Sequence, residues 1–161
     1  MMLVAGLALG ACSSAGRFDD TNAVDLNSAA GMAGTAQDPA SPMYFQQTIG
    51  DRVLFAVDQS TLSPTAMATL DGQAQWLMTN VEYNAVIEGH ADEQGTREYN
   101  LALGARRANS VLEYLSSKGV SPARMKVVSY GKERPLEICS DESCYAKNRR
   151  AVTVISAVPT S

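Results

Sequence analysis

Residues 88–115 read E-G-H-A-D-E-Q-G-T-R-E-Y-N-L-A-L-G-A-R-R-A-N-S-V-L-E-Y-L, the pattern of a strand end, a polar turn and a long helix. The apolar run 83–88 predicts a buried strand, because apolar and β-branched residues dominate it. Two glycines and several acidic or amide side chains interrupt that run over 89–95. Thr96 can then cap a helix whose end is signalled by Gly119.

The expected helix has a core-facing stripe and, beside it, a charged face. At about 100° per residue, the stripe comprises Leu101, Ala105, Ala108, Leu112 and Leu115, with Gly104 and Val111 on its flank. Asn100 and Arg107 fall just beyond that flank. The Arg107 cation is therefore expected half over the core and half over the turn that holds Asp92 and Glu93. This predicts a small charged pocket at the junction of strand and helix.

The composition describes one acidic domain with additional segments. The chain has 161 residues, 45% of them hydrophobic, and a domain typically takes about 100–150 residues. The net charge of −4 disfavours a nucleic-acid partner, because such a partner requires a basic face. The sequence contains no run of about 20 apolar residues that could span a membrane as a helix.

The remaining segments complete an α/β pattern. Strands are expected over 52–57, 125–129 and 151–157, and Ser63 followed by Pro64 starts another helix. The core-facing stripe of that helix is predicted to be Met67, Leu70, Ala74, Leu77 and Met78. The alternation of strands and helices predicts an α+β sandwich within 43–158, with two main helices packed on one face of a small mixed sheet.

The N-terminal region predicts an exported protein with a lipid anchor. Residues 1–11 are apolar and too short to span a bilayer, as in an export signal, although they carry no Lys or Arg. Cys12 completes L-G-A-C, which resembles the bacterial lipobox, and Ser13 by the same likeness implies sorting to the outer membrane. The alternative is an N-terminal strand that ends in a buried cysteine. Residues 12–42 are mostly small and polar, so a flexible tether is expected there.

Cys139 and Cys144 enclose the short acidic loop C-S-D-E-S-C. This spacing also suits a metal or a redox pair, but no further Cys or His lies nearby to complete a tetrahedral site. Because an exported protein meets an oxidising compartment, a local disulfide is predicted. No metal and no cofactor are expected.

The stretch G-H-A-D-E-Q-G-T-R-E-Y-N-L-A-L-G-A-R-R-A resembles the signature of the OmpA-like peptidoglycan-binding domain. Two later motifs, S-Y-G-K-E-R-P at 129–135 and A-K-N-R-R-A-V at 146–152, are similar to the lipid-anchored members of that family that dock to TolB. The likeness covers roughly 53–155. It implies a non-enzymatic protein that faces the periplasm, ties the outer membrane to peptidoglycan and serves envelope integrity and cell division within the Tol machinery.

The resemblance also implies a ligand, the meso-diaminopimelate of the peptide stem, whose distal carbon carries an ammonium and a carboxylate. Asp92 and Arg107 match the family's positions for the anion and the cation that hold these two groups. The other residues that it places in the site are Asn100, Leu103, Thr96, Phe55, Ala56 and Asp58, with Asn148 and Arg149 as supports of the turn. Ala56 replaces the first acid of the commoner F-D-x-D pattern, so only its backbone amide is expected to bind.

Other interpretations remain open. Asp92 and Arg107 could form an exposed ion pair without any ligand. His90 is expected to be a structural hydrogen-bonding residue, since no set of metal ligands surrounds it. Glu88 and Glu93 would suit a peptidoglycan-degrading enzyme, but no nucleophile, metal or apolar pocket supports one. A wall-binding lipoprotein that does not bind TolB is the remaining alternative.

Overall fold

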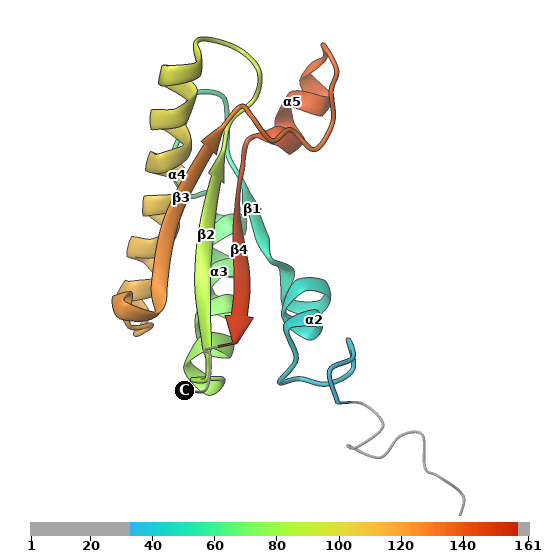
Figure 1. The fold of residues 1–161 in the computed structure, drawn as a ribbon, viewed down its shortest axis with the longest axis vertical. Helices are drawn as coiled ribbons and strands as arrows, with labels where there is room; N and C mark the ends of the chain where they lie inside the picture. The colour runs from blue at the N-terminus through green and yellow to red at the C-terminus, as the bar shows by residue number, and fades with distance from the viewer. Residues whose placement is uncertain (1–32, 158–161) are drawn as a thin grey trace, which may run out of the picture.

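The computed structural model of the chain describes residues 33–157, and Figure 1 shows their arrangement. The predicted export signal, Cys12 and the tether up to residue 32 lie outside the described residues. The elements are α2 (Pro42–Tyr44), η2 (Phe45–Gly50), β1 (Arg52–Leu54), α3 (Pro64–Thr79), β2 (Tyr83–His90), α4 (Arg97–Ser117), η3 (Pro122–Arg124), β3 (Met125–Gly131), α5 (Glu142–Asn148) and β4 (Arg150–Ala157).

The four strands form one mixed sheet in the order β1-β4-β2-β3. β4 is antiparallel to both of its neighbours, whereas β2 and β3 are parallel and are connected through α4, as a parallel pair requires. Figure 1 shows α3 behind the strands and α4 alongside β3, and the predicted fold class is confirmed. Because β1, β2 and β3 run in the same direction, the segments that follow them meet at one end of the sheet.

The main core lies between the sheet and the two long helices. Leu70 and Leu77 of α3, Leu115 of α4 and Ile87 of β2 are all buried in one apolar cluster. Ser63 and Thr96 cap α3 and α4 by accepting from Ala66 N and Tyr99 N, as predicted. Two of the residues predicted to face the core from α3, Met67 and Met78, are instead exposed, and the places beside Leu70 are taken by Ala66, Gln73 and Trp76.

The predicted stripe on α4 is partly correct: Ala108 and Leu115 are buried, but the helix is rotated relative to the prediction at its N-terminal end. Leu101 is 47% exposed, and the buried side of the helix consists of Asn100, Leu103, Gly104, Arg107, Ala108, Val111 and Leu115. The reason is a close approach of two backbones: a Cβ on Gly89 of β2 would collide with the carbonyl oxygen of Gly104. This contact rotates the helix so that Arg107, which was expected just beyond the edge of the core-facing stripe, points inward.

The folded part begins earlier than predicted. Trp76 Nε1 donates to the carbonyl of Pro39 at 2.7 Å, and the buried Ser41 caps α2. Asp38 accepts from the amides of Gly34 and Ala40. The predicted tether 12–42 is therefore wrong for its last residues, because their Asp, Ser and Pro side chains form turns that pack on α3.

Candidate functional site

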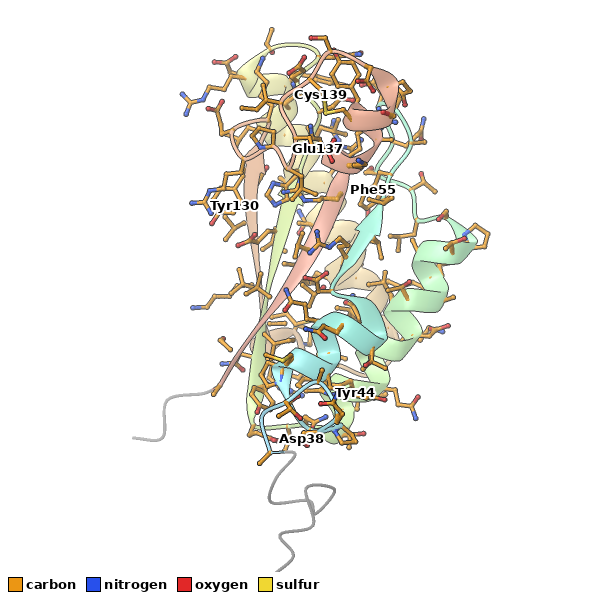
Figure 2. All side chains as sticks on the ribbon, turned by 90° about the vertical axis from the view of Figure 1, so that its right-hand side faces the viewer. Asp38, Tyr44, Phe55, Tyr130, Glu137 and Cys139 are labelled. Carbon is orange, nitrogen blue, oxygen red and sulfur yellow. A yellow bond between two sulfur atoms is a disulfide. The ribbon has the colours of Figure 1, made fainter. Side chains whose placement is uncertain are left out.

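Four segments meet beyond the carboxyl ends of β1 and β2: the loop 55–60, the turn 91–96, the first turns of α4, and α5. In Figure 2, Phe55, Glu137 and Cys139 lie toward this end, whereas Asp38 and Tyr44 lie at the opposite end. The site is thus far from the point where the described chain begins.

Arg107 lies beneath these segments and is fully buried, with an exposed fraction of 0%. Its guanidinium donates to three backbone carbonyls, those of Gln59 at 2.8 Å, His90 at 2.9 Å and Ala56 at 3.1 Å. It also lies 5.3 Å from the ring centroid of Phe55. Burial lowers the pKa of Arg107 to about 10, which leaves the side chain charged at neutral pH.

Asp92 is buried beside Arg107 but pairs with another arginine. Its Oδ2 accepts from Arg149 Nη1 at 3.2 Å, and its Oδ1 accepts from Gln94 N at 3.1 Å. Arg149 therefore braces the turn, as one of the closing arginines was expected to do. The exposed Asp92–Arg107 ion pair considered from the sequence does not form. Both residues are buried, and the guanidinium of Arg107 donates to backbone carbonyls.

The turn 91–96 is fixed from several sides. Asn100 Nδ2 donates to Gln94 O at 2.7 Å, and Lys132 Nζ donates to Gly95 O at 2.7 Å. Tyr145 Oη donates to Glu93 Oε1 at 3.1 Å, and Thr96 caps the following helix. Asn100 is thus buried as a support for the turn instead of lining an open slot. These contacts preorganise the backbone amides of the turn.

The loop after β1 covers Arg107 and carries an unusual backbone. Asp58 has φ 56°, a left-handed conformation that is uncommon outside glycine. Its carboxylate is exposed and accepts from Tyr99 Oη at 3.1 Å. Ala56 is exposed, whereas Phe55 and Leu103 are buried. Of the expected site residues, Ala56, Asp58 and Thr96 therefore face solvent.

The segment before β4 contains α5, whose first residue, Glu142, was predicted to belong to an acidic surface loop. Asp141 caps this helix by accepting from Cys144 N, and a disulfide joins Cys139 to Cys144. Glu142 pairs with Arg149 at the site, and this hydrogen bond lowers the pKa of Glu142. Asn148, predicted to be a support, accepts from Leu136 N at 2.7 Å.

Glu137, Cys139 and Cys144 could in principle gather around a metal ion. The disulfide removes both thiolates as ligands, so this group offers no suitable donor set.

Buried cations outnumber buried anions at this end of the sheet. Arg107, Arg149 and Arg150 are all at least 95% buried there, with exposed fractions of 0%, 4% and 5%. Among the described residues at this end, the buried carboxylate is that of Asp92, and Glu142 contributes from the rim. Buried charges are costly unless they are paired, so the arrangement favours the binding of an additional anionic group.

The sequence of this chain is similar to those of known proteins. A family model described as the OmpA family matches residues 54–149. A peptidoglycan-associated lipoprotein of Mesorhizobium japonicum is 51% identical over 96% of this chain and 89% of that protein. The peptidoglycan-associated lipoprotein of Rhizobium meliloti is 49% identical over 95% of this chain and 84% of that protein. The chain belongs to the OmpA family. Its curated relatives named here are peptidoglycan-associated lipoproteins, which confirms the resemblance seen in the motifs.

Two solved structures share the fold of this chain. The peptidoglycan-associated lipoprotein from Burkholderia pseudomallei has 40% identity and a TM-score of 0.67, covering 75% of this chain and 98% of that one. The C-terminal domain of Helicobacter pylori MotB, at 21% identity, shares the fold with a TM-score of 0.63, covering 68% and 86%. The OmpA family is a family of non-enzymatic binding proteins, as expected. Within 33–157, no helix of this OmpA-family chain is both long and apolar enough to cross a membrane.

His90 differs from its expected role as a hydrogen-bonding residue. The side chain is 2% exposed and stacks on Tyr130. Among the described residues neither ring nitrogen has a hydrogen-bond partner, and the nearest carboxylate is Glu88, 3.6 Å from Nε2. Burial, with the charges of Arg150 and Arg134, lowers the pKa of His90 to about 4.

This lowered pKa predicts a pH-dependent stability. As the pH falls from about 6.5 to about 4, the unfolded chain takes up a proton on His90 that the folded chain rejects. Stability present above pH 6.5 is therefore lost through that window, by about 2 kcal/mol at pH 4.5. His90→Phe keeps a ring on Tyr130 and removes the titration. We expect the variant to lose about 2 kcal/mol less than wild type between pH 7 and 4.5, as measured by guanidinium unfolding. Equal losses in the two proteins would contradict this assignment.

Proposed function

We propose that this chain is a lipid-anchored outer-membrane protein that binds peptidoglycan non-covalently through the meso-diaminopimelate of the stem peptides. The observation that carries the proposal is the excess of buried cations under the fixed turn 91–96, next to the buried carboxylate of Asp92. A zwitterionic carbon requires one fixed anion and one fixed cation close together. The membership of the OmpA family and the names of the relatives support the same ligand.

The ammonium of the ligand is proposed to bind Asp92. This carboxylate accepts one hydrogen bond from Arg149 and one from Gln94 N, so it retains acceptor capacity for a third donor. Its side chain is 10% exposed, which gives a ligand access from the turn. The exposed carboxylate of Asp58, in the loop that covers Arg107, adds negative charge near the site.

The carboxylate of the ligand is proposed to bind the backbone amides near Ala56 and Thr96, above Arg107. Three of the five N–H groups of Arg107 donate to carbonyls, which leaves two for a bidentate contact. Because Arg107 is fully buried beneath the carbonyls of Ala56 and Gln59, such direct contact requires that the loop 56–59 moves. Without that movement, the positive charge of Arg107 still attracts the ligand carboxylate through space, and the N-terminus of α4 adds to this attraction.

Lipid attachment at Cys12 is proposed to anchor the domain, with the segment after it as a tether. Asp38 and Tyr44 lie at the end of the domain opposite to Phe55 and Cys139 (Figure 2). A chain that enters at that end can present the turn 91–96 away from the membrane. This orientation suits a protein that reaches the wall from the periplasmic face of the outer membrane.

The direct test is co-sedimentation of the full chain, carrying Cys12→Ser to prevent lipid attachment, with purified sacculi. We expect the protein to pellet with the sacculi and to stay in the supernatant without them. Release of soluble wall fragments during the incubation would instead favour the degrading enzyme.

Docking to TolB and a role in cell division are proposed on the likeness of 129–135 and 146–152 to the lipid-anchored members of the family. Lys132 contacts the turn 91–96, so a surface around 129–135 adjoins the ligand site. TolB and peptidoglycan are therefore expected to compete. A pull-down in which the chain holds sacculi and TolB at once would rule out competition, and no TolB binding would favour the wall-binding lipoprotein without this partner.

A further inference from the structure

A disulfide closes the segment that leads into α5. It joins Cys139, which is partly exposed, to the buried Cys144. α5 has seven residues, which is too short for a helix to be stable alone. Its buried side chains, Cys144 and Asn148, lie outside the main apolar cluster. The disulfide and polar contacts therefore hold this helix in place.

α5 is connected to the ligand site through Glu142 and Tyr145. Glu142 pairs with the guanidinium of Arg149, whose Nη1 also donates to Asp92 Oδ2 at 3.2 Å. Tyr145 Oη donates to Glu93 on the same turn as Asp92. The position of α5 thus determines how Arg149 is shared between two carboxylates.

We propose that the Cys139–Cys144 disulfide and Glu142 are positioning residues for the wall-ligand site, and that opening the disulfide weakens binding. With α5 held in place, Glu142 accepts from both Nη1 and Nη2 of Arg149, so that Asp92 receives a hydrogen bond from Nη1 alone and keeps acceptor capacity for the ligand ammonium. When α5 is released, Arg149 turns its full fork to Asp92 and neutralises the anion that the ligand needs. The inference rests on the proposed function of this site.

A dithiol can open the bond by thiol–disulfide exchange. A thiolate of the reductant attacks Sγ of the partly exposed Cys139, and the thiolate of Cys144 leaves and takes up a proton. The second thiol of the reductant then displaces Cys139 and closes its own disulfide. Two electrons and two protons have then passed to the cysteine pair.

The test uses the full chain with Cys12→Ser, so that Cys139 and Cys144 are its only cysteines. Binding to sacculi is measured for the oxidised protein, for the protein reduced with dithiothreitol, and for Glu142→Gln in both states. We expect reduction to weaken binding about tenfold, and reoxidation to restore it. Glu142→Gln should bind about as weakly as the reduced protein and should respond little to reduction, because both changes act through Arg149. Exposed Glu82, before β2 at the other end of the sheet, supplies the matched control Glu82→Gln, which should behave like wild type.

Circular dichroism and the fluorescence of the single tryptophan, Trp76, report whether the reduced domain stays folded. The inference is overturned if the reduced protein binds as tightly as the oxidised one, if it unfolds as a whole, or if reduction weakens Glu142→Gln as much as wild type. An oxidised protein that does not bind sacculi at all overturns the proposed function itself. That outcome differs from binding that is merely insensitive to reduction.

Discussion

Asp92→Asn is expected to weaken binding to sacculi by about 30-fold or more, since truncating one partner of a buried charge pair typically costs 2–5 kcal/mol. The substitution keeps the size of the side chain and an oxygen that can accept from Gln94 N. It removes the negative charge, which leaves the ligand ammonium unpaired in a site already rich in buried arginine. Co-sedimentation over a range of sacculus concentrations measures the loss.

The matched control is Glu82→Gln, which removes the same charge from an exposed position at the far end of the sheet. It is expected to pellet like wild type. Asp92→Asn must also retain its circular dichroism spectrum, since Asp92 is one of two carboxylates paired with Arg149. A folded Asp92→Asn protein that pellets as well as Glu82→Gln would show that the anion of the site lies elsewhere.

Arg107→Met is expected to lower the free energy of unfolding by about 3 kcal/mol, because three hydrogen bonds from a fully buried guanidinium to backbone carbonyls are lost. The carbonyls of Ala56, Gln59 and His90 all lose their hydrogen bond from Arg107. The methionine side chain is similar in length to the aliphatic part of arginine, but it has no hydrogen-bond donor. Denaturant unfolding followed by Trp76 fluorescence measures the change.

The neighbouring Arg106 provides the control, since it is exposed on the same helix and stacks loosely on Tyr99. Arg106→Met should cost less than about 1 kcal/mol. Arg107→Lys keeps the charge with fewer donors and should fall between the two. If Arg107→Met and Arg106→Met were equally stable, Arg107 would not be the link between the loop 55–60 and the end of β2.

Local signals in the sequence were sufficient for the long helices. Ser63-Pro64 and Thr96 mark helix starts by their own chemistry, and the structure begins α3 and α4 directly after these caps. The polar turn and its neighbouring strand were also recognisable, although β2 continues to His90. The family motifs placed Asp92 and Arg149 in one site, where they form an ion pair.

Other features depend on contacts between distant segments and could not be predicted from local patterns. The rotation of α4 follows from the approach of Gly104 to Gly89, which leaves no trace in hydrophobic periodicity. The burial of Arg107 depends on carbonyls from two other segments. Lys132 was missed as a support of the site because it lies in the loop after β3, and Glu142 and Tyr145 were missed because α5 has no apolar repeat. Its one local signal was Asp141, a capping residue within an acidic run.

The central claim is that the site recognises a carbon bearing both an ammonium and a carboxylate. It is tested most directly by competition: the full chain with Cys12→Ser is bound to sacculi, and free meso-diaminopimelate or Nα-acetyl-L-lysine is added at increasing concentration. Nα-acetyl-L-lysine has the side-chain ammonium and one carboxylate, but none of its carbons bears both groups. We predict that meso-diaminopimelate releases the protein at a concentration at least tenfold lower than Nα-acetyl-L-lysine does, since a charge-assisted hydrogen bond contributes about 1.5–3 kcal/mol. Equal potency of the two compounds, or release by neither, would contradict the account.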